Sequence, residues 1–235
     1  MNNMLAKILA IDTSGQTMSV AVLDGQNVLA EINTNSGRKH AEGLMRAIDY
    51  CLKLAGIGLQ DGIAAVACAS GPGSFTGLRI GVSAVKGIAH GVGLGVIGVP
   101  TLDALAYNAK TPPVVPIMDA RRGQVYTSMY DYIDGVPMRL REYSCVQIDD
   151  VLKILDLLDV RATFTGDAAI IHKELLESRG HSISPELFVR ASSVGRAALK
   201  LLGDGGFPTS PHDLVPFYLR KPQAERELLA RQGGL

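Results

Sequence analysis

The sequence predicts a duplicated α/β fold, in which two halves of the order βββαβα face each other across a cleft. Apolar strands over residues 8–12 and 114–119 each end in an aspartate, Asp12 and Asp119. Each is followed by a short turn and by two further strands that an Asp-Gly pair joins, a typical hairpin signal. Helical segments and another apolar strand then follow each triplet, so the same unit occurs twice.

The elements of the first half follow from the period of their apolar residues. Short apolar runs bounded by turn residues predict strands, and a spacing of three and four predicts helices. We expect strands over 8–12, 18–23, 28–32, 63–69 and 95–99, and helices over 40–55, from the glycine-rich loop at 70–77 to residue 91, and from Thr101, which is a plausible N-cap.

The second half follows the same rules. We expect strands over 114–119, 124–130, 138–143 and 163–165, and helices over 149–158, 168–178 and 193–202. The sequence Lys-Thr-Pro-Pro at 110–113 reads as the linker, which divides the chain into an N-terminal half, 1–109, and a C-terminal half, 110–235. The final helix and tail, about 190–235, are expected to pack back on the N-terminal half.

The composition excludes several classes of protein. The 235 residues are 47% hydrophobic and carry 23 basic and 23 acidic side chains, so the net charge is zero. This balance, with 5% aromatic residues and no Trp, disfavours a module that binds RNA directly. The three cysteines are widely spaced, the first residues do not form a signal peptide, and glycine and proline interrupt the longest apolar stretches. We therefore expect a cytoplasmic protein with free thiols and no membrane contact.

The loop at 70–77 and the helix that follows it are unusual. No Gly-Lys-Ser/Thr closes the loop, which excludes a P-loop, and Thr76 stands where a dinucleotide-binding loop needs glycine. One face of the helix carries Gly77, Gly81, Ala84, Ile88 and Gly91. Because glycine costs about 0.5–1 kcal/mol in a helix, this face predicts the close approach of another backbone, from the same chain or from a partner.

The helix at 40–55 also has two faces. Beside its core face lies a second stripe formed by Gly43, Ala47, Tyr50 and Leu54. A surface helix needs only one apolar face. Two neighbouring helices that each carry a second one therefore predict a helix-to-helix subunit interface.

Several motifs together resemble the TsaB family, over about residues 5–222. They are the runs 8–14, 38–42, 70–87, 98–102, 119–126 and 216–220, of which the glycine loop and its helix and the Asp-Ala-Arg-Arg-Gly run at 119–123 are the most specific. The resemblance implies the actin-like, RNase-H-like (ASKHA) form of the duplicated fold.

The resemblance also implies a function as the non-catalytic partner in bacterial threonylcarbamoylation of tRNA. Such a subunit pairs with the catalytic paralogue TsaD through the two helices and pairs with itself when alone. TsaD then transfers threonylcarbamoyl from an adenylate, supplied by TsaC, to N6 of the adenosine beside the anticodon in tRNAs that read codons beginning with A. An ATPase subunit, TsaE, docks on the heterodimer, and tRNA is reached only through the complex.

The sequence offers little for catalysis. Asp12, Thr13 and Ser14 stand where actin-like ATPases bind phosphate and metal, but they also fit a turn that ends a strand. With Asp119, they form at most a vestigial phosphate or metal site. TsaD carries a His-x-x-x-His metal motif where this chain has Thr101 and Leu105. We therefore expect no catalytic residue, no metal and no cofactor.

Two enzyme classes are alternatives to this interpretation. An ATPase or small-molecule kinase of the actin-like superfamily would use Asp12 and Asp119 with ATP in the cleft. A protease is disfavoured because no Gly-x-Ser-x-Gly surrounds Ser14, Ser70 or Ser74.

Overall fold

The structure, a computed structural model, describes residues 6–35 and 40–220. The first half is built on a five-stranded sheet of order β3-β2-β1-β4-β5. Its strands are β1 (Lys7–Asp12), β2 (Met18–Asp24), β3 (Asn27–Thr34), β4 (Ile63–Gly71) and β5 (Gly95–Pro100). The first three are antiparallel, and β4 and β5 run parallel to β1.

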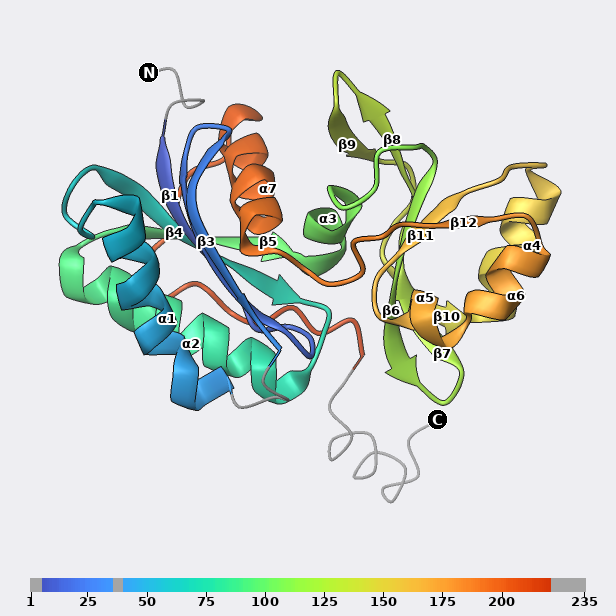
Figure 1. Cartoon of the computed structure of the whole chain (residues 1–235), viewed down its shortest axis with the longest axis horizontal. Coiled ribbons are helices and arrows are strands. Elements are labelled where there is room, and N and C mark those ends of the chain that lie inside the picture. Colours follow the sequence, from blue (N-terminus) through green and yellow to red (C-terminus); the bar gives the residue numbers. More distant parts are fainter. Residues whose placement is uncertain (1–5, 36–39, 221–235) are drawn as a thin grey trace.

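Helices cover both faces of this sheet (Figure 1). Alternate residues of β1 point to opposite faces: Leu9 and Ile11 pack beneath α1 (His40–Ala55) and α2 (Phe75–Val92). Ile8 and Ala10 pack on the other face, against α3 (Thr101–Ala106) and α7 (Ala191–Gly203). A sheet that is apolar on both faces explains the nearly continuous apolar runs in its strands.

The second half repeats the strand order of the first. Its sheet has the order β10-β7-β6-β11-β12, with the hairpin β8–β9 attached at β6. Its elements are β6 (Val114–Arg121), β7 (Gln124–Thr127), β8 (Tyr130–Ile133), β9 (Val136–Arg139), β10 (Ser144–Gln147), α4 (Ile148–Leu157), β11 (Thr163–Thr165), α5 (Ala168–Ile171), α6 (Lys173–Ser178) and β12 (Ser182–Ile183). The fold is therefore the expected duplicated α/β fold.

The third strand of the second half differs from the prediction. The segments 124–130 and 138–143 were expected to pair through one turn, but the first of them splits into β7 and the start of β8. Asp134 and Gly135 have φ of 52° and 77°, which closes β8 and β9 into a local hairpin. The sheet then takes β10 as its third strand, paired with β7.

Two smaller predictions were also wrong. Thr101 does not cap α3: Pro100 is the N-cap, without a side-chain hydrogen bond, and Thr101 is the fully buried first residue of the helix. The helix expected over 168–178 is divided at His172 into α5 and α6.

The C-terminal helix α7 is held on the N-terminal half by a buried carboxylate. Glu31 on β3 accepts hydrogen bonds from the Nε and Nη2 of Arg190, at 3.1 and 2.7 Å. Its other oxygen accepts from the backbone N of Ser192, at 2.8 Å. Burial opposes the ionisation of Glu31, but these hydrogen bonds outweigh it and hold its pKa below the ordinary 4.5. The tail beyond residue 220 lies outside the described residues.

Replacing this carboxylate weakens the fold. We expect Glu31→Gln to lower the free energy of unfolding by about 1–3 kcal/mol at pH 7, because the hydrogen bonds to a charged group are lost. The lowered pKa means that the wild type loses this stabilisation as the pH falls through the folded value, so the difference between the proteins shrinks below about pH 4.5. Urea unfolding of both proteins at several pH values measures this difference in the free energy of unfolding. Glu142→Gln, at a side chain that is 89% exposed, is the control and should show no such difference.

Candidate functional site

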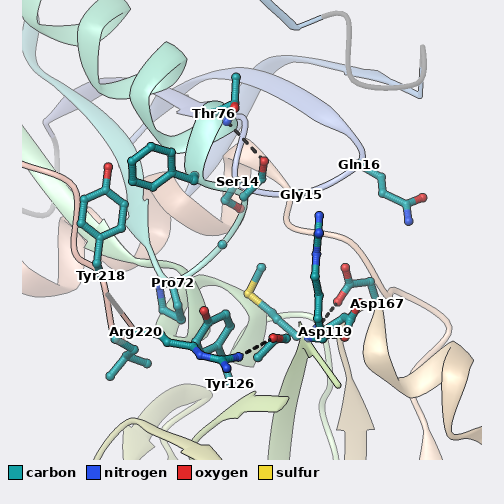
Figure 2. Close-up of a pocket in the computed structure, with 18 of the residues that line it drawn as sticks. Ser14, Gly15, Gln16, Pro72, Thr76, Asp119, Tyr126, Asp167, Tyr218 and Arg220 are labelled. Carbon is teal, nitrogen blue, oxygen red and sulfur yellow. Dashed lines mark hydrogen bonds between the residues drawn. The ribbon is translucent and has the colours of Figure 1, made fainter. Parts of the chain in front are cut away.

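A cleft of about 1170 Å³ lies between the two halves (Figure 2). One wall is the turn between β1 and β2, at 14–16, together with the N-terminus of α2. The other wall is the end of β6 with α5, and residues 217–220 close one side. Equivalent segments of the two halves therefore form the two walls of the cleft: the chain at or just after the end of the first strand of each half, β1 or β6, together with a nearby helix.

The first wall is held together by contacts between the β1–β2 turn and α2. The backbone N of Ser74 donates to the carbonyl of Ser14, at 2.7 Å, and Thr13 Oγ1 donates to the carbonyl of Gly77, at 2.7 Å. A Cβ on Gly77 would lie 2.0 Å from the carbonyl oxygen of Thr13, and one on Gly81 would lie 2.5 Å from Thr13 Oγ1. Glycine is needed at both positions because the turn lies directly on the helix.

This contact corrects part of the predicted interface. Gly77 and Gly81 are buried against Thr13 of the same chain, so their backbone neighbour is internal. The rest of the stripe on α2 differs, because Ala84 and Ile88 are partly buried and Gly91 is exposed with open space at its Cβ position.

Asp12 and Thr13 do not line the cleft. Both are buried, and one carboxylate oxygen of Asp12 accepts from the backbone N of Ser14, at 3.1 Å, while the other has no hydrogen-bond partner. Burial raises the pKa of Asp12 to about 7, although Ser14 opposes the rise. Asp12 is therefore a buried carboxyl that is partly protonated at neutral pH. Ser14 does line the cleft, so only this member of the predicted trio reaches it.

On the opposite wall Asp119 and Asp167 line the cleft (Figure 2). Asp119 accepts from the backbone N of Arg121, at 2.7 Å, and its own backbone N donates to Asp167, at 3.0 Å. Burial raises the pKa of Asp167. Arg122 and Gly123 have φ of 59° and 74°, as a tight two-residue hairpin turn requires. Sequence reasoning missed Asp167, which lies just after β11 with no motif around it.

A C-terminal strap, residues 209–220, runs from the first half to the second. Its Thr209 bridges to Val96, and Phe217 donates its backbone N to the carbonyl of Ser70, at 2.7 Å. Tyr218 stacks on Phe75, with ring centroids 5.1 Å apart. The guanidinium of Arg220 then donates to the carbonyl of Ala120 in the second half, at 3.0 Å. The strap therefore fixes one side of the cleft.

The described residues contain no group of three or more His, Cys, Asp or Glu side chains that could hold a metal ion. Thr101 and Leu105, which the sequence resemblance sets against the His-x-x-x-His motif of TsaD, are buried in the core of the first half. In the same part of the chain, no helix is both long and apolar enough to cross a membrane.

The second candidate site is the face formed by α1 and α2, which lie side by side on the first sheet (Figure 1). Tyr50 and Leu54 on α1 are 60% and 57% exposed, and Gly43 and Ala47 of the same stripe are partly buried. Sequence reasoning missed Met45, an apolar side chain on the same helix that is 57% exposed. Met45 belongs to neither of the two stripes of α1, so the spacing of apolar residues did not indicate it.

The fold and the cleft define the class of this protein. Two sheets of the same strand order, joined at a cleft lined by the first hairpin of each half, are the duplicated actin-like arrangement. A Pseudomonas aeruginosa protein described as similar to peptidase YeaZ superposes with a TM-score of 0.81 at 26% identity, over 92% of this chain and 100% of that one. Pseudomonas aeruginosa YeaZ superposes with a TM-score of 0.77 at 24% identity, over 91% and 100%.

Sequence comparison gives the family. The profile of TsaD, tRNA N6-adenosine threonylcarbamoyltransferase, matches residues 27–178. The Bacillus subtilis tRNA threonylcarbamoyladenosine biosynthesis protein TsaB is 33% identical over 96% of this chain and 99% of its own length. Escherichia coli TsaB is 38% identical over 53% and 54% of the two chains. This chain belongs to the TsaB family.

Proposed function

We propose that this chain is a non-catalytic subunit of the machinery for tRNA threonylcarbamoyladenosine biosynthesis. It pairs with a TsaD-type transferase, which modifies N6 of the adenosine beside the anticodon in tRNAs that read codons beginning with A. The names of its Bacillus and Escherichia relatives support the pathway. A TsaE-type ATPase docks on the pair, and the chain forms a homodimer when its partner is absent.

The observation that carries the proposal is the apolar α1–α2 face. Tyr50 and Leu54 are more than half exposed, although each belongs to an apolar stripe beside the buried face of α1. Next to α1, Gly91 offers open space on α2. Exposed aromatic and aliphatic side chains next to small residues are typical of helix-packing interfaces. The face therefore fits a second pair of helices, from a TsaD-type paralogue or from a second copy.

The residues in the core and at the cleft support a subunit that catalyses no reaction of its own. The positions of the paralogue's metal ligands hold Thr101 and Leu105, both buried. Of the two carboxylates that the kinase alternative needs, Asp12 is buried away from the cleft and Asp119 lines it. That alternative predicts that MgATP binds the isolated chain and is hydrolysed. A titration in which neither occurs removes it.

Sedimentation velocity tests the partnership. We mix the chain with the TsaD of the same genome and compare the mixture with each protein alone. The proposal predicts a heterodimer that forms as the homodimer disappears, together with threonylcarbamoylation of tRNA that needs both proteins. A homodimer that persists beside free TsaD contradicts the proposal.

A charge placed on the face should abolish pairing. We expect Leu54→Arg to weaken both the homodimer and the heterodimer at least about 30-fold, because a central apolar contact is replaced by a charge that must be desolvated. The matched control is Leu157→Arg, an equal change at an 86% exposed leucine on α4, and it should pair as the wild type does. If Leu54→Arg also pairs normally, this face is not the interface. Gly81→Leu is no substitute, because the side chain would collide with Thr13 and disturb the fold.

A further inference from the structure

A second cavity, of about 920 Å³, lies between the two halves and shares no lining residue with the cleft. The chain passes from the first half to the second through residues 107–113 and returns through residues 184–190 (Figure 1). Both connections border this space, which we call the linker cavity, and β3, β12 and the first turns of α7 complete its walls. Small-molecule sites have volumes of about 300–1,000 Å³, so the linker cavity is large enough for a small ligand.

Two cations in the linker cavity have no counter-charge. The third cation, Arg190, is paired: its Nη2 lies 2.7 Å from Glu31 and its Nη1 lies 3.6 Å from Glu186, the two carboxylates of this cavity. Lys110 on the linker and Arg196 on α7 also line the cavity. Neither of them forms an ion pair with any residue that the structure describes. The linker cavity therefore keeps two uncompensated positive charges.

The phenol of Tyr107 lines the same cavity but does not neutralise these charges. Burial raises its pKa, and the positive charge of Arg196 opposes the rise without cancelling it. The phenol therefore keeps its proton at neutral pH and supplies no negative charge to Arg196.

A buried hydroxyl of the second half also faces the linker cavity. Thr163 and Thr165 lie on one face of β11, because side chains two residues apart in a strand point the same way. Thr165 Oγ1 donates to the carbonyl of Glu186, at 2.7 Å. Thr163 is 9% exposed and lines the cavity, and its Oγ1 forms no hydrogen bond within the described part of the chain. Buried polar groups are almost always hydrogen-bonded, so Thr163 indicates a bound group that satisfies it.

These three side chains determine which chemistry a ligand needs. Lysine and arginine only donate hydrogen bonds and carry positive charge, and a threonine hydroxyl can donate as well. A group that satisfies all three must accept several hydrogen bonds and carry negative charge. Carboxylates and phosphates do both, and the planar guanidinium of arginine can donate two parallel hydrogen bonds to either of them.

We propose that the linker cavity binds an oxyanion, the carboxylate or phosphate of a small molecule, through Arg196, Lys110 and Thr163. Arg196 belongs to α7 on the first half, Thr163 to β11 of the second half, and Lys110 to the linker between them. The bound oxyanion therefore joins the two halves at a place separate from the cleft. The site binds without reaction and does not involve the α1–α2 face, so it is independent of the proposed pairing.

Calorimetric titration of the full chain with citrate, pyrophosphate and inorganic phosphate, each without metal, tests the site. We expect saturable binding of at least one of these anions with a Kd of about 1 mM or tighter. Arg196→Gln should weaken it about tenfold or more, because a charge-assisted hydrogen bond is lost. Thr163→Val keeps the shape of the side chain without its hydroxyl and should weaken binding about threefold or more. Tighter binding of citrate assigns the site to a carboxylate ligand, tighter binding of either phosphate assigns it to a phosphate ligand, and similar affinities mean that it selects negative charge alone.

A matched control separates the linker cavity from other binding sites. Arg141→Gln makes the same change at an exposed arginine that lines neither cavity, and it should bind as the wild type does. Equal unfolding midpoints show that the variants are folded. If none of the three anions binds saturably, the proposal is wrong. It is also wrong if Arg196→Gln and Thr163→Val leave the binding unchanged, because the anion then binds elsewhere on the chain.

Discussion

Gly77→Ala is expected to destabilise the protein by about 3 kcal/mol, although alanine is the better helix former. The new Cβ would stand 2.0 Å from the carbonyl oxygen of Thr13, a backbone atom that cannot rotate away. The β1–β2 turn must then move off α2, which strains the bond from Thr13 Oγ1 to the carbonyl of Gly77 and the bond between Ser74 and Ser14. Overpacking of this kind outweighs a gain of about 1 kcal/mol in helix propensity.

Thermal and urea unfolding of this variant, compared with a Gly→Ala variant at another position of α2, measure the effect. For a chain of this size, a loss of about 3 kcal/mol lowers the midpoint by roughly 6–12 °C. Gly87 is exposed with nothing within 4 Å of its Cβ position, so Gly87→Ala should raise stability by about 0.5–1 kcal/mol. If both substitutions stabilise the protein, the turn does not lie on α2 as the structure has it.

The fold was largely predictable because the pattern within each element is strong. β1, β4 and β11 are short apolar runs, and α1 and α2 have clear apolar stripes, so their type and approximate bounds follow from periodicity. The prediction failed where two local signals competed. The turn at Asp134 and Gly135 does form a hairpin, as expected, but sequence alone does not say that its strands leave the main sheet.

The site was less predictable than the fold. The pattern of apolar and small residues shows which face of a helix or strand a residue lies on, but it does not show which other element packs against that face. The small face of α2 indicated a close backbone, and the structure divides it between an internal contact at Gly77 and Gly81 and a free surface at Gly91. His40 lacked any ligand spacing in the sequence. It reaches the cleft only because α1 begins beside the β1–β2 turn, a contact between elements that periodicity does not encode. Asp167 was missed for the same reason.

Asp12 is expected to make the protein less stable as the pH rises. Its folded pKa of about 7 lies above the ordinary 3.8, mainly because burial disfavours the charge. Below about pH 4 the carboxyl is protonated in both states. Between these two pKa values the unfolded chain releases the proton while the folded chain keeps it, so stability falls by about 1.4 kcal/mol per pH unit, and above pH 7 the loss levels off at about 4 kcal/mol.

The variant Asp12→Asn removes this dependence, because an amide stays neutral and still accepts the hydrogen bond from Ser14. Urea unfolding of both proteins at pH 5, 6, 7 and 8 should show the variant gaining about 2–3 kcal/mol on the wild type across that range, since the titration of every other group cancels in the difference. Asp159→Asn, at an exposed turn, should show no such trend. A difference between Asp12→Asn and the wild type that stays constant with pH would mean that Asp12 ionises at its ordinary pKa, and therefore that water reaches its carboxylate in the folded protein.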